Sequence, residues 1–137
     1  MMPRVFTGKV VIPGDKIEEV LKGAAEFEKA RKPFRQHLTA LNEEFAASLS
    51  TRYAARTVRK HTGIVEMFVE FLCSYTDVEM IEEITRGMAN THFRQWYKRK
   101  VWDSATPDDL RVALKKFFQF LGTEKGIHNP KVLESFR

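Results

Sequence analysis

The spacing of apolar residues constrains this chain most, because it follows the period of an α-helix along most of the sequence. Between residues 17 and 121, apolar side chains recur three and four positions apart, which places them on one face of a helix. The chain shows no strand–helix alternation and no internal repeat of fixed period. The pattern predicts an all-α single domain of four to five helices.

Residues 1–14 are predicted to be extended, and residues 15–50 to form two helices. Asp15 is a favoured N-cap, and Glu18 three residues later completes the pattern of a capping box. Pro33 is predicted to end the first helix, because the residue before a proline avoids the α region. The second helix is expected to run from Phe34 to Leu49. The extended segment contains two short apolar runs, Val5-Phe6 and Val10-Val11-Ile12.

Two further helices are predicted after a break at residues 50–54. The first of them carries an apolar stripe from Val58 to Leu72, at helical spacing. Thr85 is expected to cap the next helix, since a threonine hydroxyl can accept a hydrogen bond from a first-turn N–H. The acidic stretch at residues 77–83 between them is expected to form a short helical turn.

The last predicted helix has the clearest start. Thr106 is an N-cap, Pro107 stands at the favoured first position, and Asp108 and Asp109 complement the helix dipole. Gly126 is expected to terminate this helix. Residues 131–137 are expected to form a C-terminal tail.

Composition excludes several classes of protein. Of 137 residues, 43% are hydrophobic and 30% are charged, which is an ordinary globular balance. A single cysteine cannot form an internal disulfide, so the chain does not have the pattern of a secreted scaffold. No apolar run approaches the roughly 18 residues of a membrane span, and no signal-peptide pattern stands at the N-terminus. We expect a soluble cytoplasmic protein without a membrane partner.

The residues that carry catalysis or bind metals are not grouped in this sequence. No histidine has a second ligand three or four positions away on its helix, and the lone Cys73 follows Leu72 on an apolar helix, so a buried thiol is expected. No phosphate-binding glycine motif occurs. We therefore expect no metal, no cofactor, no small-molecule substrate and no enzymatic activity. The four histidines are His37, His61, His92 and His128.

The net charge of +5 favours a polyanionic partner, and the positions of the cations show where it would bind. Arg52, Arg56, Arg59 and Lys60 gather at the approach and first turn of the helix around Val58, where a cation costs about 0.3–1 kcal/mol. Exposed N–H groups and converging cations at a helix start favour phosphate. A merely solvated charged face is the alternative.

Two other groups of cations are weaker evidence for a polyanionic partner. Lys98, Arg99 and Lys100 are predicted at the C-terminal end of their helix, where the helix dipole itself stabilises them. On the last helix, Arg111 can pair with Asp108 three residues before it. Lys115 and Lys116 have no acidic residue three or four positions before them, so they are free for a partner.

The third predicted helix resembles the opening helix of the core-binding, SAM-like domain of tyrosine recombinases and phage integrases. That pattern is a threonine near the helix start, an aromatic or similar residue four later, where His61 departs from the usual aromatic, and then F-x-x-[FW]-L. Its places are filled here by Thr57, His61, Phe68, Phe71 and Leu72. The resemblance runs from about Phe45 to the Asn-Pro pair that ends at Pro130. Residues 51–130 are therefore expected to form a core-binding-like region, in one compact domain with residues 15–50.

The resemblance implies a SAM-like helical bundle that docks basic helices on double-stranded DNA and contacts other recombinase subunits. The family's catalytic domain, with its H-x-x-R motif and tyrosine nucleophile, has no counterpart in this sequence, so a non-catalytic DNA-binding module is expected. The predicted DNA contacts are Arg52, Arg56, Thr57, Arg59, Lys60, Arg111, Lys115 and Lys116. The alternative is a protein–protein module that assembles through an aromatic-rich face, formed by Trp102, Phe117, Phe118 and Phe120.

Overall fold

A single long helix, α1 (Ile17–Ser50), is the largest element of the computed structural model, which describes residues 3–6 and 12–136. Pro33 lies inside this helix, so the prediction that it separates two helices is wrong. The predicted capping box is wrong as well. Asp15 lies in a short 3-10 turn, η1 (Gly14–Lys16), and Lys16 takes the N-cap position of α1 without a side-chain hydrogen bond.

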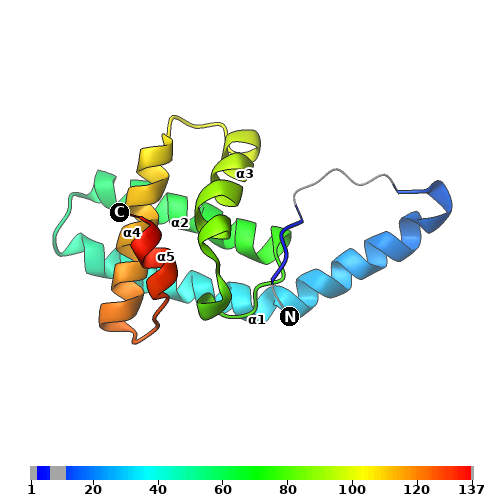
Figure 1. Cartoon of the computed structure of the whole chain (residues 1–137), viewed down its shortest axis with the longest axis horizontal. Helices are drawn as coiled ribbons and strands as arrows, with labels where there is room; N and C mark the ends of the chain where they lie inside the picture. The colour runs from blue at the N-terminus through cyan, green and yellow to red at the C-terminus, as the bar shows by residue number, and fades with distance from the viewer. Residues whose placement is uncertain (1–2, 7–11, 137) are drawn as a thin grey trace.

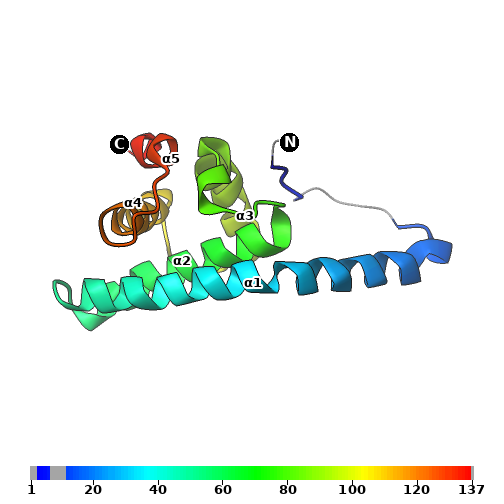
Figure 2. The same cartoon turned by 90° about the horizontal axis from the view of Figure 1, so that it is seen from below.

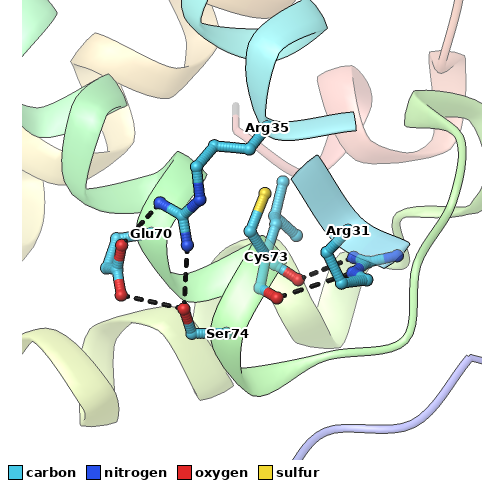
Figure 3. Close-up of polar contacts among 6 residues, drawn as sticks. Arg31, Arg35, Glu70, Cys73 and Ser74 are labelled. Carbon is cyan, nitrogen blue, oxygen red and sulfur yellow. Dashed lines mark hydrogen bonds and ion pairs between the residues drawn. The ribbon is translucent and has the colours of Figure 1, made fainter. Parts of the chain in front are cut away.

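Contacts with the next helix hold α1 together on both sides of Pro33. Arg31 donates to the backbone carbonyls of Leu72 at 3.0 Å and of Cys73 at 3.5 Å (Figure 3). Arg35 donates to the carboxylate of Glu70 at 2.7 Å and to the hydroxyl of Ser74 at 2.9 Å. An internal proline removes one backbone hydrogen bond. Tertiary contacts of this kind offset that loss.

The described helices form two layers. The first layer contains α1 and α2 (Ala55–Tyr75), which lie side by side after a turn at residues 51–54 (Figures 1 and 2). The second layer contains α3 (Phe93–Lys100), α4 (Pro107–Glu124) and α5 (Pro130–Ser135). α2 packs against α1 in its own layer and against α3 and α4 in the second layer, and nine of its side chains are buried. The predicted all-α fold is confirmed.

The region between α2 and α3 matches the sequence analysis closely. The acidic stretch contains a short 3-10 turn, η2 (Ile81–Glu83). The hydroxyl of Thr85 then accepts a hydrogen bond from the N–H of Met88 at 3.2 Å, as expected of a cap. A π-helical turn, η3 (Met88–His92), leads directly into α3. Such turns arise where one extra residue is accommodated within a helix.

The start of α4 is confirmed in detail. Thr106 Oγ1 accepts from the N–H of Asp109 at 3.1 Å, and Asp109 Oδ2 accepts from the N–H of Thr106 at 2.8 Å, which is a reciprocal capping box. Gly126 follows the helix with φ +65°, a conformation that glycine adopts at little cost.

The chain after Gly126 forms a helix that the sequence analysis did not expect. Asn129 caps α5, accepting from the N–H of Val132 at 3.2 Å, and Pro130 takes the first position. Val132 and Phe136 are fully buried, so this segment, expected only as a tail, contributes to the core.

One aromatic-rich core joins the two layers. Its largest fully buried side chains include Phe45 from α1, Phe68 and Phe71 from α2, Phe93 from α3 and Phe117 from α4. Burial of this kind is the main stabilising contribution to such a fold. None of the helices in the described residues has the length and apolarity needed to cross a membrane.

The N-terminal segment packs back onto the end of α2. Val5 forms an isolated bridge with Thr76, and Phe6 lies edge-on to the ring of Phe27 at 6.2 Å between centroids. Arg4 pairs with Asp77 through both its backbone N–H and its guanidinium. The predicted extended run at Val10-Val11 lies outside the described residues.

Candidate nucleic-acid interface

The turn between α1 and α2 brings four of the predicted cations to one end of the molecule. Arg52 lies in this turn, and Arg56, Arg59 and Lys60 follow on the first turns of α2. All four are exposed, whereas Val58, between them, is buried. The predicted polar face opposite the apolar stripe is therefore present. Thr57, the predicted hydroxyl donor, is half-buried beside them.

The N-terminus of α2 lacks the groups that usually satisfy a helix start. Ala54 occupies the N-cap position and provides no side-chain hydrogen bond, and the first turn contains no acidic residue. The free N–H groups and the helix dipole make this end electropositive, equivalent to about half a positive charge. The neighbouring arginines add to that potential instead of opposing it.

Lys60 is the member of this group with an acidic partner. Its Nζ lies 2.9 Å from Oδ1 of Asp109, at the start of α4. The contact helps to lower the pKa of Asp109, after the larger effect of the hydrogen bond from the backbone of Thr106. No ion pair among the described residues involves Arg56 or Arg59. Spacing along one helix could not show this contact, because Lys60 and Asp109 lie on different helices.

An open groove runs along this face of α2. Its volume is about 650 Å³, and Arg56, Arg59 and Lys60 line one wall. The acidic residues that line the groove are Glu66 on α2, Asp103 on the α3–α4 connection and Asp109 at the start of α4. The exposed Arg56 and Arg59 thus border a groove of mixed charge.

On α4, Lys116 faces the α1–α2 turn. Its Nζ donates to the hydroxyl of Tyr53 at 2.9 Å and lies 4.7 Å from the centre of the same ring. That hydrogen bond lowers the pKa of Tyr53. Arg52 lines the same pocket as Tyr53 and Lys116. Tyr53 was not among the predicted site residues, and its contact joins residues too far apart in sequence for helix spacing to show.

Arg111 and Lys115 lie on a different side of α4. The guanidinium of Arg111 donates to Asp108, which confirms the predicted helix-face pair, and to the backbone carbonyl of Phe136 at 2.9 Å. Arg111 therefore attaches α5 to α4. Lys115 is one turn further along the Arg111 face. The structure separates these two residues from Lys116.

The buried His61 lies directly beneath the cations. It is 7% exposed, and its Nδ1 has no hydrogen-bond partner among the described residues. Burial lowers the pKa of His61, and the charges of Lys116 and Lys60 lower it further, while Asp109 opposes them. His61 therefore lies within electrostatic reach of Lys60 on α2, Lys116 on α4 and Asp109.

We call this region the basic end. Its cations come from the α1–α2 turn, from α2 and from α4, and they converge on the N-terminus of α2. The basic end consists of Arg52, Arg56, Arg59, Lys60 and Lys116.

The aromatic face of the alternative prediction is not present. Phe117, Phe118 and Phe120 are 2%, 3% and 7% exposed, so these side chains belong to the core. Trp102 is 92% exposed, on the α3–α4 connection. The adjacent aromatic residues of α4 indicated an exposed face. However, α2 and α5 both pack against α4, so it is covered on more than one side.

The remaining chemical groups are placed as follows. Cys73 is buried, as expected, and burial raises the pKa of its thiol. Within residues 3–6 and 12–136, no three acidic, histidine or cysteine side chains are grouped as metal ligands would be. Lys98, Arg99 and Lys100 occupy the last turn of α3, as predicted.

No family model, curated protein or solved structure matches this chain.

Proposed function

We propose that this chain is a DNA-binding module that places its basic end against the phosphates of duplex DNA. The observation that carries the proposal is the convergence of Arg52, Arg56, Arg59, Lys60 and Lys116 on an uncapped helix N-terminus. Phosphate contacts from lysine, arginine and helix N-termini position many proteins on DNA. They supply most of the affinity that does not depend on base sequence.

Folding alone does not account for the positions of Arg56 and Arg59. Cations at a helix N-terminus oppose the dipole, at about 0.3–1 kcal/mol each when exposed. Arg56 and Arg59 also lack an acidic partner in the described part of the chain. An anionic partner would relieve this repulsion and satisfy the free N–H groups of the first turn. The fully paired Arg111, by contrast, has a structural explanation and is left out of the proposed contacts.

The proposal extends to the class of module. The resemblance of α2 and the following helices to the core-binding domain of tyrosine recombinases supports a non-catalytic, cytoplasmic DNA-recombination module. In such a role the domain would dock on one side of the duplex. The contacts would be mainly to phosphates, with the hydroxyl of Thr57 as a further donor at the start of α2.

The test is a salt titration of DNA binding with two charge-matched variants. We expect the wild type to bind duplex DNA with a Kd on the order of 10⁻⁴–10⁻⁶ M at physiological salt. Arg56→Gln/Arg59→Gln should weaken binding at least tenfold at low salt and reduce the salt dependence by about two counterions. Lys98→Gln/Lys100→Gln removes the same charge from the last turn of α3 and should weaken binding much less.

Fluorescence anisotropy on one labelled duplex gives all three titrations, and circular dichroism melts check that each variant is folded. Equal loss of affinity in both variants would show that net charge alone governs binding. A larger loss in the α3 variant would place the docking surface elsewhere. Absence of binding by folded wild type at low salt would reject the proposal.

A further inference from the structure

The α3–α4 connection, residues 101–106, presents the most exposed of the large apolar side chains in the described part of the chain (Figure 1). Trp102 is 92% exposed, and its indole N–H reaches only the backbone carbonyl of Arg99, at 3.4 Å. The other large apolar side chains that are exposed in the described residues lie on other parts of the chain. Trp102 therefore offers a partner one flat ring and not a broad apolar surface.

Cations lie on two sides of this connection. The residues that flank Trp102 in sequence line the groove bordered by Arg56 and Arg59. They also line a second groove of about 570 Å³, whose cations are Arg94 and Lys98. These four cations are exposed, and none of them forms an ion pair among the described residues. The surroundings of Trp102 therefore favour an anionic partner.

Most of the acidic side chains of the two grooves are already engaged. Asp103 accepts from the hydroxyl of Tyr97 at 2.5 Å and from a backbone N–H of the connection at 2.9 Å. Asp109 caps α4 and pairs with Lys60. The same contacts fix the connection on the C-terminal side of Trp102. The indole is thus held on a turn with its own hydrogen bonds, beside cations that are open to a partner.

We propose that Trp102 is a base-stacking residue, which binds the face of an unpaired nucleobase in DNA whose phosphates lie against the basic end. This inference rests on the proposed function. In a paired duplex both faces of a base are covered by its neighbours, so an indole gains a stacking partner at the least cost where a base is unpaired. Aromatic side chains beside a positively charged groove bind exposed bases in this way. Trp102 then gives the module a preference for duplexes that contain an unpaired base.

The first experiment compares two labelled duplexes of the same length by fluorescence anisotropy at one salt concentration. One duplex is fully paired, and the other has one unpaired adenine at its centre. We expect the wild type to bind the second about fivefold more tightly or better. Trp102→Ala should bind both duplexes with the affinity that the wild type has for the paired one, and Trp102→Phe should keep part of the preference. Met80→Ala is the matched control and should keep all of it, since Met80 is an exposed apolar residue, at 53%, outside both grooves.

The second experiment uses the fluorescence of the protein itself. Trp96 and Trp102 are its two tryptophans, and Trp96 is only 3% exposed. The difference between the emission of the wild type and that of Trp102→Phe therefore reports Trp102. We expect the duplex with the unpaired adenine to quench this emission more strongly than the paired duplex does. Vesicles of anionic phospholipid are the control for a membrane partner, and they should not shift the emission to shorter wavelength, because membrane-surface helices carry several apolar side chains on one face.

The outcomes separate this inference from the proposed function. Equal binding of the two duplexes by the wild type would overturn the role of Trp102 and leave the proposed function intact. An equal loss of affinity for both duplexes in Trp102→Ala would overturn it as well, as would a shift of the emission by vesicles without quenching by DNA. Absence of binding to either duplex by folded wild type would reject both proposals. Thermal melts check that each variant is folded.

Discussion

At the scale of single residues, Asn129 connects two distant parts of the fold. Its Nδ2 donates to the backbone carbonyls of Ile81 and Ile84, both at 2.9 Å, while its Oδ1 caps α5. In the sequence, this asparagine stands out only as part of the Asn-Pro pair at the end of the resemblance. Its three hydrogen bonds give it a structural role instead.

Replacing Asn129 should therefore destabilise the protein. We expect Asn129→Ala to lower the free energy of unfolding by about 1–3 kcal/mol, because two carbonyls lose a donor and α5 loses its cap. Asn129→Asp keeps the capping oxygen but loses the amide donors, so its loss should be smaller. Urea denaturation measures both. An alanine variant as stable as the wild type would contradict this role.

His61 should make stability depend on pH. Its pKa in the folded protein is lowered from 6.5, mainly by burial, and by the charges of Lys116 and Lys60. The unfolded chain therefore binds the proton more readily, and stability should fall as the pH decreases below about 6.5. The carboxylates whose pKa values are lowered, including Glu70, Asp77 and Asp109, lose their contribution only in more acidic solution, below about 4.5.

The comparison with His61→Gln isolates this effect, since glutamine does not titrate. We expect the urea midpoint of the wild type to fall between pH 7.5 and pH 5.5, and that of the variant to change less over the same interval. If both proteins lose the same stability over this interval, another group is responsible.

At the scale of elements, the sequence predicted best where local signals and packing agree. The helix starting at Pro107 carries its own cap, dipole-complementing acids and glycine terminator, and the structure has all of them. α1 was divided wrongly because the local effect of Pro33 was outweighed by contacts of Arg31 and Arg35 with α2, 35 or more residues away. Those contacts leave no periodic trace in the sequence.

For α5 the error was the opposite one: a local signal was present in the sequence, but the helix was not predicted. Asn129 followed by Pro130 is a helix start of the same form as Thr106 followed by Pro107, so a signal was present. Six residues are too few for an apolar period to be recognised. Only the docking of Val132 and Phe136 in the core shows that this short helix is formed.

The cost of the internal proline gives a prediction for α1. Pro33→Ala should raise the free energy of unfolding by about 1–3 kcal/mol, because a backbone hydrogen bond to residue 29 becomes available, less the entropy that proline removes from the unfolded chain. Pro130→Ala is the control, since the first helical position needs no N–H donor and no gain is expected there. Guanidinium denaturation compares them. A destabilised Pro33→Ala variant would show that the proline shapes α1 to its partner.

At the scale of the whole molecule, the candidate site combines what a sequence can show with what only the fold shows. The α2 cations were found because they occupy the polar face of a clearly periodic helix. The pairing of Lys60 with Asp109, the contact of Lys116 with Tyr53 and the attachment of Arg111 to Phe136 join separate elements. Helix spacing therefore could not show which α4 cations belong to the basic end.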